Sequence, residues 1–304
     1  MSAIVVKLTL VALIWGGSFI AGRVAAQEIP ATTAALTRYV IASVVLVAMA
    51  FAKEGGLPRL DARQWIAAAL LGLTGVAAYN YLFLVGLETV PASRGSLIMA
   101  LNPAATMIGA ALFLREPVTV AKVAGTLIAL VGVAIELSGG NPLALLGGGI
   151  GRGELALFGC VLGWSAYTLI GKKVAGVSNL AITTYAALLG TVRLFIVALA
   201  RGELALPQAS ARAWWALVYM GTLGTAVAFV WFLEGVKTLG PARAAIFVNL
   251  VPVAAIALAA LLLGERITLA MIVGGALVIA GVWIINRPTA AAPALAPALP
   301  HSHC

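Results

Sequence analysis

The fold is decided by a stretch that occurs twice, 149 residues apart: residues 83–89 read Phe-Leu-Val-Gly-Leu-Glu-Thr, and residues 232–238 read Phe-Leu-Glu-Gly-Val-Lys-Thr. Outward from these stretches, the same shift without a gap aligns further pairs, among them Trp15 with Trp164, Arg94 with Arg243, Pro103 with Pro252 and Glu116 with Glu265. Chance matches in apolar sequence involve alanine and leucine rather than tryptophan, proline or charged residues. The chain is therefore predicted to consist of two homologous halves, in which only the second helix needs a gap.

The composition indicates that this repeat lies in a membrane. Of the 304 residues, 62% are hydrophobic and 10% are charged, with a mean hydropathy of +1.09, whereas soluble domains carry roughly 25% charged residues. The net charge of +9 comes from basic residues scattered singly, with no block longer than Lys172-Lys173, which excludes a nucleic-acid-binding surface. The apolar run after Lys7 resembles a signal peptide, but Arg23 and the repeat favour a retained helix.

Ten membrane spans are expected, because about 20 apolar residues cross a hydrocarbon core ~30 Å thick. Cutting at charges, glycines and prolines gives residues 4–26, 31–52, 64–87, 91–114, 118–138, 153–172, 179–200, 212–236, 241–263 and 268–286. The predicted divisions are a first five-helix repeat (1–138), a Gly-rich linker (139–152), a second repeat (153–287) and a disordered tail (288–304). Because five is odd, the second repeat is inverted. The fold class is an all-α polytopic membrane protein with a 5+5 inverted repeat.

The basic residues also predict the orientation. Eleven of them fall at the N-terminus, the even-numbered loops and the C-terminus, and six fall in the opposite loops. Since loops rich in lysine and arginine stay in the cytoplasm, both termini are expected there. The expected location is the bacterial inner (plasma) membrane.

Two motifs resemble a known family. Trp15-Gly-Gly-Ser-Phe19 in the first expected helix, and Leu263-Gly-Glu-Arg-Ile-Thr268 after the ninth, resemble the EamA-type members of the drug/metabolite transporter superfamily. A proline in helices four and nine, followed by a glutamate, agrees with it. The resemblance covers residues 4–287, and within the superfamily the chain is similar to YddG-type aromatic amino-acid exporters. It implies ten helices, cytoplasmic termini, a cavity formed by helices 1, 3, 4, 6, 8 and 9, peripheral fifth and tenth helices, and export of amino acids or related metabolites.

Aromatic and polar side chains inside the expected spans are the candidates for a solute-binding cavity. Aromatic walls with a few polar groups suit an amphiphilic solute with an apolar side chain. The alternative is anchoring at the membrane interface, where tryptophan and tyrosine are enriched. The candidate solute-binding residues are Trp15, Ser18, Tyr79, Phe83, Met99, Asn102, Trp164, Tyr167, Thr168, Trp231 and Asn249.

Pro103 and Pro252 are the candidate hinges, since they occupy equivalent mid-span positions of helices four and nine. Each proline removes a backbone hydrogen bond to the carbonyl four residues earlier, at Met99 and Val248. The functional interpretation is a kink that hinges during transport, and the alternative is a static kink whose carbonyl is satisfied locally.

Arg38 and Arg193 lie inside expected spans. Such charges either attract an anionic group or snorkel to the interface. No acidic residue lies clearly at a span centre, so no carboxylate proton relay is expected, and Glu116 and Glu265 are expected to cap helix ends. His301, His303 and Cys304 resemble a metal-binding tract on the tail, but neither a metal nor a cofactor is expected.

These features favour a transporter over an enzyme. Intramembrane aspartyl proteolysis needs two aspartates, and Asp61, the only one, lies in a loop, while both histidines lie in the tail. The expected function is export of aromatic and other neutral amino acids, or related metabolites, by alternating access. A transporter of drugs or other metabolites and a channel-like facilitator remain alternatives. The expected partners are a small-molecule substrate and the lipid bilayer, without nucleic acid, and the protein is expected to be a monomer or weak homodimer.

Overall fold

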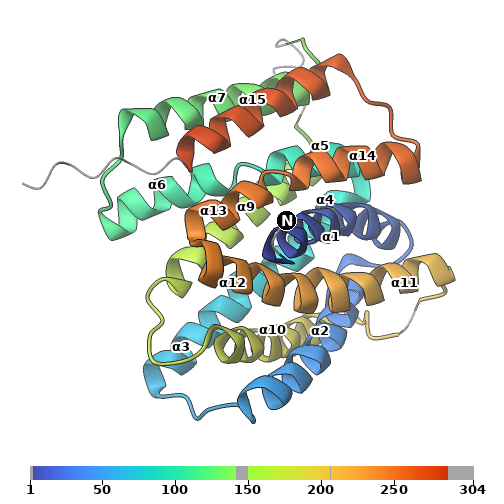
Figure 1. The fold of residues 1–304 in the computed structure, drawn as a ribbon. Helices are drawn as coiled ribbons and strands as arrows, with labels where there is room; N and C mark the ends of the chain where they lie inside the picture. The colour runs from blue at the N-terminus through green and yellow to red at the C-terminus, as the bar shows by residue number, and fades with distance from the viewer. Residues whose placement is uncertain (1–2, 142–149, 206, 287–304) are drawn as a thin grey trace, which may run out of the picture.

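A computed structural model describes residues 3–141, 150–205 and 207–286, and Figure 1 shows them as a bundle of helices. In this part of the chain, nine helical segments of 18 or more residues are apolar enough to cross a membrane, and Leu269–Ile285 is a shorter tenth. The predicted fold class of ten transmembrane helices in two inverted five-helix halves is confirmed. Most of the predicted linker (142–149) and the whole predicted tail (288–304) lie outside the described residues.

The spans follow one another in the same order in both halves. The first half comprises α1 (Ala3–Ala26), α2 (Ala31–Glu54), α3–η1–α4 (Ala62–Leu71, Gly72–Ala78, Tyr79–Thr89), α5–α6 (Ala92–Met99, Asn102–Leu114) and α7 (Val120–Leu137). The second half comprises α9 (Arg152–Gly171), α10 (Asn179–Arg201), α11–η2–α12 (Ala211–Tyr219, Met220–Val227, Ala228–Leu239), α13–α14 (Pro241–Val248, Val251–Leu263) and α15 (Leu269–Ile285). The predicted span boundaries agree with these within three residues.

Local sequence sets where the helices start and stop. Thr119 and Thr268, equivalent in the repeat, accept hydrogen bonds from Lys122 N (3.4 Å) and Met271 N (3.1 Å) at the starts of α7 and α15. A threonine oxygen at this position satisfies a backbone N–H that the first turn leaves free. Gly55 caps the end of α2, and its φ of 74° is the left-handed conformation that glycine adopts without strain.

The third span of each half contains a π-helical turn at an equivalent position, η1 and η2. A π turn leaves helical carbonyls in need of other donors. At η1, Asn80 Nδ2 from the first turn of α4 donates to the carbonyls of Gly75 (3.3 Å) and Val76 (2.8 Å). In η2, the Thr225 hydroxyl donates to the Met220 carbonyl (2.8 Å). A side chain from the helix that follows η1 and one from within η2 therefore satisfy these carbonyls inside the bundle.

The fourth span of each half is interrupted rather than kinked. Helix α5 ends at Met99 and α6 starts at Asn102, and the second half repeats this break between Val248 and Val251. Pro103 and Pro252 each occupy the second position of the helix after the break. Proline is favoured in a first turn, where its missing N–H costs no helical bond, so each proline starts a new helix segment.

Helices α7 and α15 pack against each other at one edge of the bundle, where Figure 1 shows them side by side. Glycines of both helices face the partner backbone closely. A Cβ added at Gly132 would lie 2.5 Å from the Gly274 carbonyl oxygen and 2.8 Å from the Val278 nitrogen. Inside a lipid bilayer the hydrophobic effect does not drive helices together. Close van der Waals packing between backbones, as at these glycines, holds two helices together instead.

The substitution Gly132→Leu is therefore expected to destabilise the protein by about 1–3 kcal/mol, the usual cost of inserting bulk into a packed interface. The measurement is the Tm of the detergent-solubilised protein. Gly171→Leu is the control, because a Cβ at Gly171 meets nothing within 4 Å. Equal Tm values for the two variants would show that the α7–α15 contact does not depend on Gly132.

Candidate functional site

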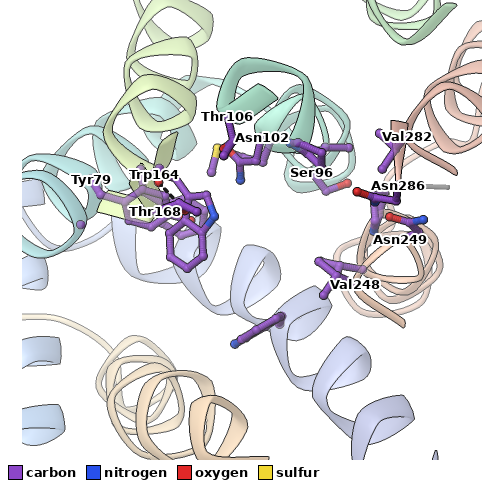
Figure 2. Close-up of a pocket in the computed structure, with 18 of the residues that line it drawn as sticks. Tyr79, Ser96, Asn102, Thr106, Trp164, Thr168, Val248, Asn249, Val282 and Asn286 are labelled. Atoms are coloured by element: carbon purple, nitrogen blue, oxygen red, sulfur yellow. Dashed lines mark hydrogen bonds between the residues drawn. The ribbon is translucent and has the colours of Figure 1, made fainter. Parts of the chain in front are cut away.

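A cavity of about 480 Å³ lies between the two halves. Pockets for small molecules typically enclose about 300–1,000 Å³. Side chains from both halves line it, including those of the six spans expected from the family resemblance. Figure 2 shows Trp164 beside Tyr79 and Thr168 on one side and Asn249 beside Val248 on the other.

The structure brings most of the sequence-predicted residues together around this cavity. The residues that line it are Trp15, Ser18, Tyr79, Phe83, Met99, Asn102, Trp164, Thr168 and Asn249, with the two predicted hinges Pro103 and Pro252. Both helix interruptions therefore open onto the same space. Their role in binding and movement is taken up as a proposal below.

Tyr167 and Trp231 are the two predicted residues that do not line the cavity. The Tyr167 ring packs behind the wall, against Gly75, and stacks on Trp164 with ring centroids 5.5 Å apart. On α12, Phe229 lines the cavity instead of Trp231. Two residues along a helix correspond to a rotation of about 200°, which turns Trp231 away from the face of Phe229.

The aromatic walls are held in place by contacts across the two halves. Trp15 Nε1 donates to the Gly224 carbonyl in η2 (3.0 Å), so the π turn orients the indole. Tyr79 on α4 and Trp164 on α9 have ring centroids 5.6 Å apart, and Tyr79 stacks on Phe83 at 6.1 Å. These contacts leave a rigid apolar surface suited to an aromatic or aliphatic side chain.

The sequence interpretation missed contributions from α2 and α15. Arg38 and Tyr39 of α2 line the cavity, as do Val278 and Val282 of α15. The tenth helix, expected to be peripheral, therefore presents its inner face to the site, because α15 also packs on α5 and α6. Its sequence is apolar all round, so no pattern distinguishes the lipid face from the cavity face.

Arg38 does not snorkel to the interface. It is 8% exposed, and its Nε and Nη2 lie 3.4 and 3.2 Å from the Thr225 hydroxyl on η2. Arg193, by contrast, is partly exposed, does not line the cavity and donates to the carbonyl of Leu189 on its own helix (3.3 Å). The signal for Arg38 was its charge inside a span, but its burial depends on the packing of α2 against η2.

The cavity reaches one face of the bundle, which we call the N-terminal face because α1 begins there. Glu116, Lys122, Lys172 and Asn286 line this end of the cavity, at the ends of α6, α7, α9 and α15. Glu116 forms an ion pair with Lys172 at 3.0 Å, with both side chains nearly half exposed. On the same face, Glu234 bridges Lys7 (2.7 Å) and Lys53 (3.5 Å).

On the opposite face, Glu265 in the loop after α14 contacts the start of α5. Its carboxylate accepts hydrogen bonds from Ala92 N (2.8 Å), Ser93 N (3.1 Å) and the Ser93 hydroxyl. A carboxylate at a helix N-terminus is stabilised by the free N–H groups and the helix dipole. Glu265 therefore ties the loop after α14 to the turn before α5, and we call this contact the Glu265 latch.

We expect Glu265→Gln to raise labelling of a cysteine at Ser96 by a membrane-impermeant maleimide from this face about tenfold. Charge-assisted hydrogen bonds are worth about 1.5–3 kcal/mol, and 1.4 kcal/mol corresponds to tenfold. The background is Cys160→Ala with Cys304→Ser, assayed in vesicles of each orientation. Glu116→Gln is the control, because an exposed ion pair contributes only about 0–1 kcal/mol. Labelling that Glu265→Gln leaves unchanged would show that the latch does not hold this face closed.

Comparison with known proteins identifies the family to which the sequence is similar. A model described as the EamA-like transporter family matches twice, over residues 3–137 and 151–287. A protein of Streptantibioticus cattleyicolor named "Probable terminal-alkyne amino-acid exporter" is 33% identical, covering 95% of each chain. The uncharacterized transporter YyaM of Bacillus subtilis is 29% identical, covering 83% of each chain. One crystal structure, 20% identical with a TM-score of 0.67, covers 93% of this chain and 97% of its own, and shows likeness of fold.

Proposed function

Because the chain belongs to the EamA-like transporter family, we propose that this multi-pass membrane protein exports neutral amino acids, aromatic ones included, or closely related metabolites. The observation that carries the proposal is the cavity between the inverted halves, with Trp15, Tyr79 and Trp164 in its walls. Aromatic surfaces bind an apolar side chain, while Asn102, Asn249 and other polar residues offer partners for polar groups. The 33% identity to a protein named as an amino-acid exporter supports the same substrate class.

The proposed mechanism is alternating access. The two five-helix halves act as the moving units, and exchanging their slightly different conformations moves the opening from one face to the other. The interruptions before Pro103 and Pro252 are the proposed hinges, since both line the cavity and neither is bridged by regular helix. Short breaks in helices absorb dihedral changes with little cost to the surrounding packing.

The proposed location is the inner membrane, with the N-terminal face in the cytoplasm. The excess of lysine and arginine on that side supports this orientation. With this topology, the conformation described above is open to the cytoplasm and closed on the outside by the Glu265 latch. A solute would enter from the cytoplasm between Glu116 and Asn286.

Counterflow of labelled phenylalanine in proteoliposomes tests the proposal. Purified protein is expected to give saturable counterflow that unlabelled neutral amino acids compete for and charged ones do not. Runs with and without a pH gradient measure proton coupling, and planar-bilayer recordings test for a pore. Voltage-driven currents without counterflow would show that the protein is a channel and not a carrier. Competition by drugs but by no amino acid would show that the substrates are drugs and not amino acids.

A further inference from the structure

Arg38 is a buried cation in the wall of the transport cavity. It lies on α2 seven residues after the helix begins, about 10 Å along the axis at 1.5 Å per residue. The residue is 8% exposed and lines the cavity, so its contact with water runs through that space. A lysine or arginine that snorkels, by contrast, contacts water at the membrane surface.

The guanidinium is only partly satisfied within the protein. Its Nε and Nη2 share the single hydroxyl of Thr225, and its charge lies 5.7 Å from the ring of Tyr39. In the part of the chain that the structure describes, no carboxylate lies within 4 Å of it. A buried charge without a counterion is costly, and inside a membrane such a residue usually serves a ligand or an ion pathway.

The other charges that line the cavity lie at its mouth. Glu116, Lys122 and Lys172 are on the N-terminal face, and Glu116 is already paired with Lys172. The inner part of the cavity therefore carries the positive charge of Arg38 without a described negative charge to balance it. Such a site attracts an anion and disfavours a cation of the same size.

We propose that Arg38 binds the carboxylate of the transported solute. Carboxylate and guanidinium form charge-assisted hydrogen bonds, and the Nη1 group, which donates to no described residue, is available for one. Elsewhere in the cavity wall, the Asn102 Oδ1 is a buried acceptor without a donor in the described residues, and it suits an N–H of the solute. The inference rests on the proposed function and narrows it to solutes that carry a carboxylate.

Three matched solutes distinguish the contribution of the solute's carboxylate to binding from that of its amine. They are phenylalanine, its amide, which lacks the carboxylate, and 3-phenylpropionate, which lacks the amine. Binding to the purified protein is measured by calorimetry, and counterflow by competition. The wild type is expected to bind phenylalanine at least tenfold more tightly than the amide. In Arg38→Gln that ratio is expected to fall to about one, through weaker phenylalanine binding with amide binding unchanged. Arg38→Lys is expected to retain part of the ratio.

Arg193→Gln is the matched control, since it removes an intramembrane arginine that does not line the cavity, and the ratio is expected to be preserved. If Arg38 only holds α2 against η2, Arg38→Gln will weaken all three solutes equally, which overturns the inference. Equal transport of phenylalanine and its amide by the wild type also overturns it but leaves amino-acid export standing. Arg38-dependent binding of phenylpropionate, without transport of any amino acid, would support the Arg38 site and refute the proposed substrate. If none of the three binds in an Arg38-dependent way, the Arg38 site is refuted.

Discussion

Replacing Trp164 by alanine is expected to slow phenylalanine counterflow at low solute concentration by about thirtyfold to hundredfold. The indole lines the cavity and packs against the rings of Tyr79 and Tyr167, with ring centroids 5.6 and 5.5 Å away. Truncating an aromatic anchor of this kind typically costs 2 kcal/mol or more of binding, and each 1.4 kcal/mol is about tenfold. The measurement is the counterflow rate across a range of phenylalanine concentrations, with Kd measured separately.

The control for this prediction is Trp215→Ala. Trp215 lies on α11, is 70% exposed in the bundle and does not line the cavity. Its loss removes the same side chain from the outer surface, so Kd is expected to stay within twofold. Tyr79→Ala is expected to behave like Trp164→Ala. If both cavity variants transported like the wild type, the proposed lining would be wrong.

The double substitution Pro103→Ala with Pro252→Ala is expected to lower the turnover rate about tenfold or more while leaving Kd within twofold. Alanine restores an N–H for the carbonyl four residues earlier and removes the clash there, so each break can close into continuous helix. The helical preference of alanine over proline is about 3 kcal/mol per site, and part of that stabilisation would oppose hinge movement. Single-turnover counterflow measures the rate, and equilibrium binding measures Kd.

Pro117→Ala is the corresponding control. Pro117 is exposed in the connection between α6 and α7, outside any helix, and its replacement is expected to change neither quantity. A double variant with unchanged turnover would show that the interruptions are fixed structural breaks, which is the alternative interpretation of both prolines.

The sequence was sufficient for the fold because two independent signals agree. Hydropathy places the spans within three residues of the observed helices, and equivalent pairs such as Trp15 with Trp164 establish the repeat. The two prolines correctly indicated that the fourth and ninth spans depart from a continuous straight helix. What hydropathy could not distinguish is a kink from a full interruption, because both leave the same apolar run.

The parts of the site that were missed depend on rotation and packing. Trp231 and Phe229 are two residues apart in an apolar helix, and only the packed bundle determines which one faces inward. In lipid, the outer and inner faces of a helix are both apolar, so the inward valines of α15 carry no distinguishing pattern. The π turns were also not predicted, since Gly72–Ala78 and Met220–Val227 look like ordinary helix in composition.

The Glu265 latch has no counterpart that the other half could form in the same way. The repeat shift places Pro241 and Ala242 where the first half has Ala92 and Ser93, so Glu116 would meet neither a hydroxyl nor the first of the two amide N–H groups. Two states of unequal stability are unequally populated, and solute binding must supply the difference. In the proposed topology, the molecule without bound solute would therefore mostly populate the conformation whose cavity is accessible from the cytosol, ready to bind the next solute there.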